Sequence, residues 1–298
     1  MKKRNDVFTT LNNKTTSPTI TIIIDTKGVN DMPIVRQTHV VYTVQPGDTL
    51  YSIAARFGST ILGIQRANQL IPPITDPGLI FHGWTLIIPV LAERPFRTIY
   101  ITAPTDSLFR IGQRFSAHTD LIAGVNQLQD PNLIFVGQPL WAPAFVYEIE
   151  MGDTLFSISR RFQIPMANII AANDGRPGFS LDLIYAGFLL LLPLPSTRNI
   201  VVIRPLPGDS IRGGDRIEGF ARVFEANVLM QIQDDNGVVV SQERFTTALE
   251  GPPAYGYFFE TVVFDRTPTT TGGQLWVYSR SAVDGSIIDL VQIRVGFV

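Results

Sequence analysis

Residues 42–57 read YTVQPGDTLYSIAARF, and this pattern returns twice along the chain. The other copies begin at Tyr100 and Tyr147, and each copy joins a short strand to a helix through a turn that contains aspartate. Apolar residues at positions i, i+3 and i+7 after the turn predict one buried helix face per copy. These triads are Leu50, Ile53 and Phe57; Leu108, Ile111 and Phe115; and Leu155, Ile158 and Phe162.

A constant spacing links each turn to a later asparagine. The distance is 20 residues in every copy, from Asp48 to Asn68, from Asp106 to Asn126 and from Asp153 to Asn173. A second short helix fits before each asparagine, and a strand that ends in proline closes the copy. We therefore expect three strand–helix–helix–strand modules, at residues 39–91, 97–144 and 145–195. The asparagines are expected to be helix-end or turn residues, and contact with a ligand is the weaker interpretation.

The first copy, Tyr-x-Val-x-Pro-Gly-Asp-Thr-Leu-x-x-Ile-Ala-x-x-Phe, closely resembles the LysM module. The third copy matches almost as well, with Met151 in place of proline, whereas the second has Thr105 where the glycine belongs. Glycine permits a positive φ, so Thr105 is expected to strain or reshape the turn. The binding prediction is therefore confined to the first and third copies.

The resemblance implies a shallow groove for glycans that contain N-acetylglucosamine, such as peptidoglycan or chitin, between the first turn and the loop before the last strand. Backbone amides of the turn can donate hydrogen bonds to an acetamido group without a catalytic group or cofactor. For the two turn aspartates, helix capping is the expected role and direct contact with the sugar is the alternative. The residues implied in the groove are Gly47, Asp48, Thr49, Leu50, Leu79 and Ile80, together with Gly152, Asp153, Thr154, Leu155, Leu183 and Ile184.

Other recurring side chains receive structural interpretations. Tyr51, Phe109 and Phe156 recur beside the turn, where a sugar-stacking platform is conceivable but core packing is the expected use. Arg160 and Arg161 are expected on a solvated helix face.

After Pro195 the helical periodicity disappears, and the chain reads as short strands. Asp235-Asn236-Gly237 predicts a hairpin with a two-residue Asn-Gly turn. About 100 residues with six or seven strands suit a β-sandwich over 198–298. The stretches at 205–208, 219–226 and 281–286 resemble the immunoglobulin-like domain of bacterial spore germination proteins, which completes an α+β fold class.

The first 38 residues predict an extended arm rather than a module. Its β-branched strand is expected to pair with a sheet edge, preferably on a neighbouring subunit and alternatively on the chain's own sandwich. This assembly strand comprises Thr19, Ile20, Thr21, Ile22, Ile23 and Ile24.

Composition excludes several kinds of chemistry. The chain has no cysteine, and His39, His82 and His118 lack the spacing of metal ligands, so we expect no metal or cofactor. The net charge of −2 does not attract nucleic acid. No apolar run has the length of a signal peptide or a membrane helix, so membrane insertion is not expected. Asp234 and Asp235 are assigned to a turn rather than to glycoside hydrolysis, and no enzyme is expected.

Two functions compete. The first is a non-enzymatic cell-wall or spore-envelope protein, whose modules bind glycan while the sandwich contacts other envelope proteins. A spore-surface or envelope location agrees with the lack of a recognisable signal peptide. The second is a self-assembling fibre or coat subunit, a homo-oligomer in which the modules serve protein contacts and the arm pairs with a neighbour. All lysines precede residue 28, so arginine is the only one of the two basic residues in the rest of the chain. This bias is consistent with contact-covered surfaces, and compositional drift is the alternative explanation.

Overall fold

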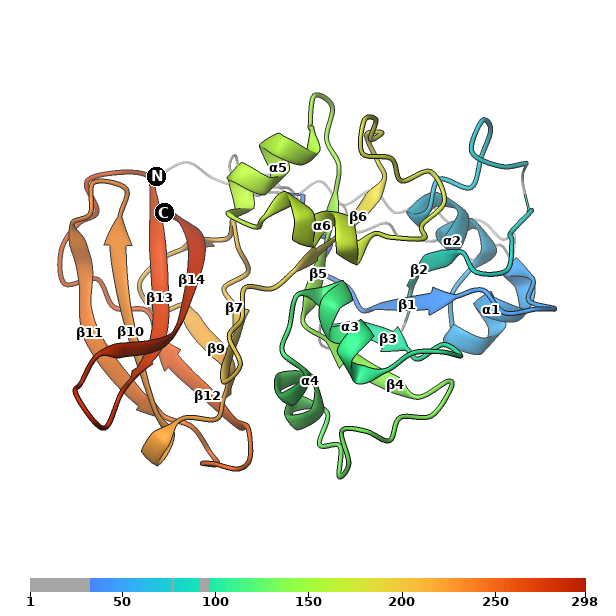
Figure 1. The fold of residues 1–298 in the computed structure, drawn as a ribbon. Helices are drawn as coiled ribbons and strands as arrows, with labels where there is room; N and C mark the ends of the chain where they lie inside the picture. The colour runs from blue at the N-terminus through green and yellow to red at the C-terminus, as the bar shows by residue number, and fades with distance from the viewer. Residues whose placement is uncertain (1–32, 77, 92–96) are drawn as a thin grey trace, which may run out of the picture. The chain divides into compact units, whose positions relative to one another are not determined.

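Residues 33–76, 78–91 and 97–298 are described by the computed structural model. They belong to one compact unit in which three helix-containing modules precede a β-rich part (Figure 1). This arrangement confirms a mixed α and β fold with a β-rich C-terminal part. The predicted assembly strand, Thr19 to Ile24, lies outside the described residues.

Each module contains two helices between two strands. Module 1 comprises β1 (His39–Thr43), α1 (Leu50–Phe57), α2 (Ile61–Ala67) and β2 (Thr85–Pro89). Module 2 comprises β3 (Thr98–Ile101), α3 (Leu108–Phe115), α4 (Thr119–Val125) and β4 (Pro139–Ala142). Module 3 comprises β5 (Ala144–Glu148), α5 (Leu155–Phe162), α6 (Met166–Ala172) and β6 (Leu189–Pro193). The predicted apolar triads are buried, except that Phe57 is half-buried against the core of module 1.

Modules 1 and 2 share one sheet. Its strand order is β2-β1-β3-β4, and the central strands β1 and β3 are parallel, with His39 opposite Thr98. Strands β5 and β6 of module 3 form a separate antiparallel pair. The chain just before β1 extends this pair, because Val35 N donates to Val146 O at 2.9 Å and Ile34 bridges Tyr147. The end of the arm therefore adds to β5 of its own chain.

A buried arginine joins modules 1 and 3. The Arg176 guanidinium donates to Asn173 Oδ1 at 2.9 Å and to Asn68 Oδ1 at 3.3 Å, and it lies 4.3 Å from the centroid of the Phe188 ring. Desolvation, helped by the nearby charge of Arg114, lowers the pKa of Arg176 to about 9. Since this guanidinium is held by amide and carbonyl oxygens, it fixes the two modules against each other through neutral partners.

The asparagines are helix-end residues, as expected. Asn68 follows the last residue of α2, where its side-chain amide donates to Ile64 O at 2.9 Å and to Ile87 O at 2.7 Å. Asn173 makes the equivalent bonds at the end of α6. Each side chain thus ties the end of its second helix to the closing strand of the module.

The C-terminal part consists of two sheets, β11-β10-β13-β14-β8 and β12-β9-β7. Their facing sides enclose a core that includes Val228, Phe258 and Ile293. A 3₁₀ turn, Phe224–Ala226, precedes β10. The strands are β7 (Ile200–Arg204), β8 (Ser210–Ile211), β9 (Arg216–Ala221), β10 (Asn227–Asp234), β11 (Val239–Thr247), β12 (Gly256–Thr261), β13 (Gly272–Arg280) and β14 (Ile287–Phe297).

The hairpin between β10 and β11 differs from the expected two-residue turn. Only Gly237 has a positive φ, of 75°, and its amide donates to Asp234 O at 2.9 Å. This geometry is a type I turn followed by a left-handed glycine, the usual three-residue hairpin loop. Asp234 accepts from Thr269 and from the Val238 amide, while Asp235 pairs with Arg294. The carboxylates therefore serve the turn, as predicted.

Candidate functional site

The two predicted sides of the groove begin at the same backbone pair in each module. In module 1, Val44 N donates to Trp84 O at 2.8 Å and Gly83 N donates to Val44 O at 3.0 Å. The turn after β1 and the loop before β2 both emerge from this pair. Thr102 and Ile149 make the same two bonds in modules 2 and 3. Each module therefore brings its turn and its loop together at one end.

The turn keeps one conformation in all three modules. The φ angles are +84° at Gly47, +78° at Thr105 and +89° at Gly152. Thr105 therefore strains the turn without changing its course, since a β-branched residue is a genuine outlier at positive φ. No atom outside the turn lies within 4 Å of a Cβ built on Gly47 or Gly152, so the space above both glycines is open.

The turn aspartate binds the preceding strand rather than the helix. Asp48 Oδ2 accepts from Tyr42 OH at 2.6 Å and from Gln45 N at 2.7 Å, and Asp106 and Asp153 accept from the equivalent donors. The expected capping role was therefore wrong for the aspartates. The next residue caps each first helix: Thr49 Oγ1 accepts from Ser52 N at 3.0 Å, and Thr49 N donates to Ser52 Oγ at 3.0 Å.

An arginine completes this network in modules 1 and 3. Arg56 donates to Tyr42 OH at 2.9 Å, and Arg161 donates to Tyr147 OH and, at 2.6 Å, to Asp153 Oδ1. Arg161 was expected on a solvated helix face, and this interpretation was wrong. We name this set of contacts the tyrosine–aspartate–arginine lock.

Burial keeps the tyrosines of the lock in their donor form. Desolvation, with help from Asp48, raises the pKa of Tyr42 to about 12, and desolvation likewise raises the pKa of Tyr147. A visible signal could have predicted the lock, because tyrosine, aspartate and arginine recur at offsets 0, 6 and 14 in every copy. In module 2, however, Arg114 at this position donates to Asp174 O at 3.1 Å instead.

Not every predicted groove residue presents its side chain. Leu50 and Leu155 are buried in the module cores, so only their backbone is available to a ligand. Leu79 and Leu183 are about half exposed, at 48% and 53%, and Ile80 and Ile184 pack partly against the cores. The apolar rim is therefore formed mainly by the loop leucines.

The aromatic residue beside each turn is exposed. Tyr51 is 74% exposed, and Phe109 and Phe156 are each 63% exposed, so the prediction of core packing was wrong. The physical reason is helical geometry: each aromatic follows a buried leucine by one residue and so points about 100° away from it. These rings add an aromatic surface at the start of the first helix of each module.

The histidines do not form a metal site. His39 is buried, His82 is exposed and His118 caps α4 by accepting from Asp120 N at 3.1 Å. Across the described ranges, no cluster of three or more His, Cys, Asp or Glu side chains could hold a metal ion. Within the same ranges, no helix combines the length and apolar character needed to cross a membrane.

Comparison with known families agrees with this architecture. The LysM domain model matches residues 42–89, 100–143 and 147–193, and the chain belongs to the LysM-domain proteins. The model for the immunoglobulin-like domain of bacterial spore germination matches residues 199–286. The particular combination is therefore three LysM domains followed by one such immunoglobulin-like domain. Both kinds of domain are binding modules.

The chain is similar to parts of several known proteins. It is 40% identical over 159 residues to the "Putative sporulation-specific glycosylase YdhD" of Bacillus subtilis, covering 51% of this chain and 36% of that protein. It is 30% identical over 166 residues to the secreted LysM effector ECP6 of Passalora fulva, covering 46% of this chain and 71% of the effector. The crystal structure of the spore cortex-lytic enzyme SleL from Bacillus cereus is 33% identical, with a TM-score of 0.27, over 35% of this chain and 22% of SleL. The chain thus spans about a third of the glycosylase.

Proposed function

We propose that the protein is a non-enzymatic binding protein of the bacterial cell wall or spore envelope. Modules 1 and 3 would bind glycans that contain N-acetylglucosamine. The observation that carries this proposal is the turn of these two modules, where a glycine with positive φ stands under open space beside an exposed aromatic ring. Similarity to a sporulation-specific protein and the germination-type domain support the envelope location.

The turn can supply what an acetamido group requires. Within the lock, the Asp48 carboxylate accepts hydrogen bonds from Tyr42 OH and Gln45 N, so this side chain stabilises the conformation of the turn. The Ser52 amide donates to the capping Thr49 side chain, but the Leu50 and Tyr51 amides have no acceptor within α1 and can donate to a carbonyl oxygen. Leu79 offers a partly exposed apolar surface on the loop side, and Tyr51 offers an aromatic ring on the helix side. The same elements recur at Gly152, Phe156 and Leu183.

The carboxyl groups with shifted pKa values bear on whether the protein could hydrolyse a glycan. A general acid in a glycoside hydrolase requires a raised pKa. In the part of the chain that the structure describes, every carboxyl group with a shifted pKa is shifted downward, because arginines, hydroxyls or backbone amides stabilise the charged form. Zymography on peptidoglycan tests this point, and a cleared band would refute the non-enzymatic assignment.

The proposed grooves are tested by retention on insoluble peptidoglycan and chitin. The double variant Gly47→Leu/Gly152→Leu places bulk over both turns, and we expect it to lose retention that the unaltered protein shows. Leucine at positive φ also adds strain, so a matched control is needed. Gly58→Leu/Gly214→Leu carries the same kind of strain, at φ of +63° and +95° under open space, away from both turns.

The outcome of the comparison is decisive. Retention by the control variant with loss in the groove variant supports the proposed sites. Equal retention by both variants would refute them, and absence of retention by the unaltered protein would refute glycan binding altogether.

The sandwich favours a second candidate function, assembly through protein contacts. Phe245 is 68% exposed on β11, Phe259 is 50% exposed on β12 and Leu249 is 75% exposed between these strands. Thr246 Oγ1 donates to Phe259 O at 2.9 Å, so the two strands are adjacent. Electron microscopy over a range of concentrations tests this candidate, and uniformly small particles at every concentration would refute it.

A further inference from the structure

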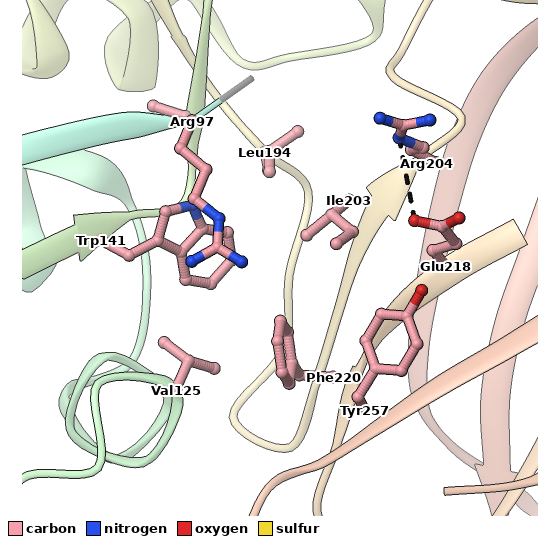
Figure 2. Close-up of a pocket in the computed structure, with 10 residues that line it drawn as sticks. Arg97, Val125, Trp141, Leu194, Ile203, Arg204, Glu218, Phe220 and Tyr257 are labelled. Atoms are coloured by element: carbon pink, nitrogen blue, oxygen red, sulfur yellow. Dashed lines mark ion pairs between the residues drawn. The ribbon is translucent and has the colours of Figure 1, made fainter. Parts of the chain in front are cut away.

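A separate cavity of about 320 Å³ lies where modules 2 and 3 meet the sandwich. Figure 2 shows Arg97 and Trp141 on one side, and Arg204, Glu218 and Tyr257 on the other, with Phe220 between them. Its lining comes from the residue before β3, from α4, β4 and β5, from the residue after β6 and from the β12-β9-β7 sheet. We name it the junction pocket. It contains none of the predicted groove residues.

Side chains that alternate along β9 and β12 form the side of the junction pocket that belongs to the sandwich. On β9, Ile217 and Ala221 point into the sandwich core, and so Glu218 and Phe220 point to the other face. Tyr257 on β12 pairs with Phe220, which places both rings on this outer face. The sheet that covers the sandwich core on one side therefore lines the junction pocket on the other.

Polar contacts beside the pocket hold its two walls together. Asp120 on α4 accepts from Arg198 at 2.8 Å and from Arg222 at 3.2 Å. Tyr255 OH donates to Arg198 O at 2.7 Å. A Cβ built on Gly124 would lie 2.0 Å from the Tyr255 ring, so α4 packs directly on the sandwich. These contacts fix the two walls of the junction pocket relative to each other.

Three aromatic rings line the pocket, with Phe220 inclined by 50° to Trp141 and by 67° to Tyr257. The centroids of Trp141 and Phe220 are 5.9 Å apart, and those of Phe220 and Tyr257 are 5.7 Å apart. All three side chains are only partly buried. The face of a single aromatic ring suits the C–H face of a sugar ring, because aromatic ring faces carry negative charge and C–H groups are weakly positive.

The charged groups around the pocket favour an anion. Glu218 lies 3.8 Å from both Arg204 and Arg216, so one carboxylate is shared by two guanidinium groups. Arg97 adds a third cation and is exposed, and among the described residues it pairs with no carboxylate. Of the residues that line the pocket, two are arginines and one is a glutamate, so the lining is positive by one charge, although the whole chain is slightly acidic. Arginine also provides the planar donor pair that fits a carboxylate.

We propose that the junction pocket binds a saccharide ring that carries a carboxylate. The sugar face packs on one of the aromatic rings, the carboxylate faces Arg97, and hydroxyl groups reach Glu218 and Tyr257. Peptidoglycan contains such a ring wherever its lactyl ether bears no peptide, and chitin does not contain it. The inference deepens the proposed function, on which it rests for the choice of sugar, by selecting peptidoglycan over chitin.

The test compares three soluble probes on the full chain: N-acetylmuramic acid, N-acetylglucosamine and lactate. The first probe joins the second to the carboxylate of the third. The indole N–H resonance of Trp141, assigned with a Trp141→Phe variant, reports on the pocket. We expect N-acetylmuramic acid to shift this resonance with an affinity at least tenfold above that of either other probe. Equal binding of lactate, or of N-acetylglucosamine, would refute the acidic-saccharide assignment.

Matched variants separate the pocket from the LysM grooves. Arg97→Gln is expected to weaken N-acetylmuramic acid at least fivefold, whereas Arg66→Gln, at an exposed arginine of α2, leaves it unchanged. The Gly47→Leu/Gly152→Leu variant is expected to keep the Trp141 response while losing retention on chitin. An unchanged affinity in Arg97→Gln would overturn the junction-pocket proposal, and this result is independent of whether the LysM grooves bind.

Discussion

Removal of the Asp153 carboxylate should destabilise module 3 substantially. The side chain is only 3% exposed and accepts from Tyr147 OH, from Glu150 N at 2.9 Å and from Arg161 at 2.6 Å. Breaking a buried ion pair costs about 3–5 kcal/mol, but Arg161 is 30% exposed and regains water. We therefore expect Asp153→Ala to lower the free energy of unfolding by about 3 kcal/mol.

The equivalent aspartate of module 2 provides a comparison for the expected loss of stability. Asp106 accepts from Tyr100 OH and from Ala103 N, both at 2.7 Å, but forms no arginine pair in the described structure. With one charged partner fewer, Asp106→Ala should cost about 2 kcal/mol, because each hydrogen bond to a charged group contributes roughly 1.5–3 kcal/mol and neighbouring bonds are not additive. The order of the two variants is as important as either value.

Urea denaturation followed by circular dichroism measures both changes. The control is Asp182→Ala, at an exposed aspartate of the module 3 loop, which should change stability by less than about 0.5 kcal/mol. A midpoint shift with an unchanged slope identifies a true change of stability. A loss below about 1 kcal/mol for Asp153→Ala, or a larger loss for Asp106→Ala, would refute the role assigned to the lock.

Four further outcomes are expected. Desolvation is the main cause that lowers the pKa of His39 to about 4, so the unfolded chain binds a proton at this histidine more readily than the folded chain. As the pH falls from 6.5 to 4, the free energy of unfolding should decrease by roughly 3 kcal/mol and the urea midpoint should fall with it. The His39→Leu variant should lack this decrease. Thr105→Gly should raise the melting temperature by relieving a positive φ worth about 1 kcal/mol, and a lower melting temperature would contradict the strain. Arg176→Met should cost about 2–4 kcal/mol in urea denaturation, since Asn68 and Asn173 each lose a charged donor, and an unchanged midpoint would show that the buried cation is dispensable. Deleting residues 1–30 should abolish any higher-order species in analytical ultracentrifugation, and their persistence would exclude strand exchange by the arm.

Local signals in the sequence predicted the modules and part of the site. Apolar periodicity located the first helices, and the asparagine spacing located the ends of the second helices, because both patterns act within one or two turns of chain. The roles of Asp48 and Tyr51 were missed although their surroundings are local. Asp48 accepts from the Tyr42 hydroxyl, six residues earlier, instead of from the amides of the helix. Tyr51 follows the buried Leu50 by one residue, so its ring points away from the core.

Contacts between distant segments could not be read in this way. Arg176 meets Asn68 across more than 100 residues, and nothing in its neighbours in the sequence marks it as buried. The junction pocket joins Trp141 of module 2 to Tyr257 of the sandwich, and its existence depends on how the domains pack. Sequence periodicity carries no information about such packing, which the structure alone provides.

The clamp that Arg176 forms between modules 1 and 3 has a consequence for polymeric ligands. When two grooves are held at a fixed separation, binding of one glycan strand to the second groove becomes intramolecular. The affinity then depends on whether a single glycan strand can reach both grooves. Linked sites can gain about 10²–10⁴ in avidity when the geometry fits, and gain nothing when it does not. Under the proposed function, modules 1 and 3 therefore select glycans by length. A short oligosaccharide occupies one groove, and only a glycan strand long enough to reach the second groove is bound strongly.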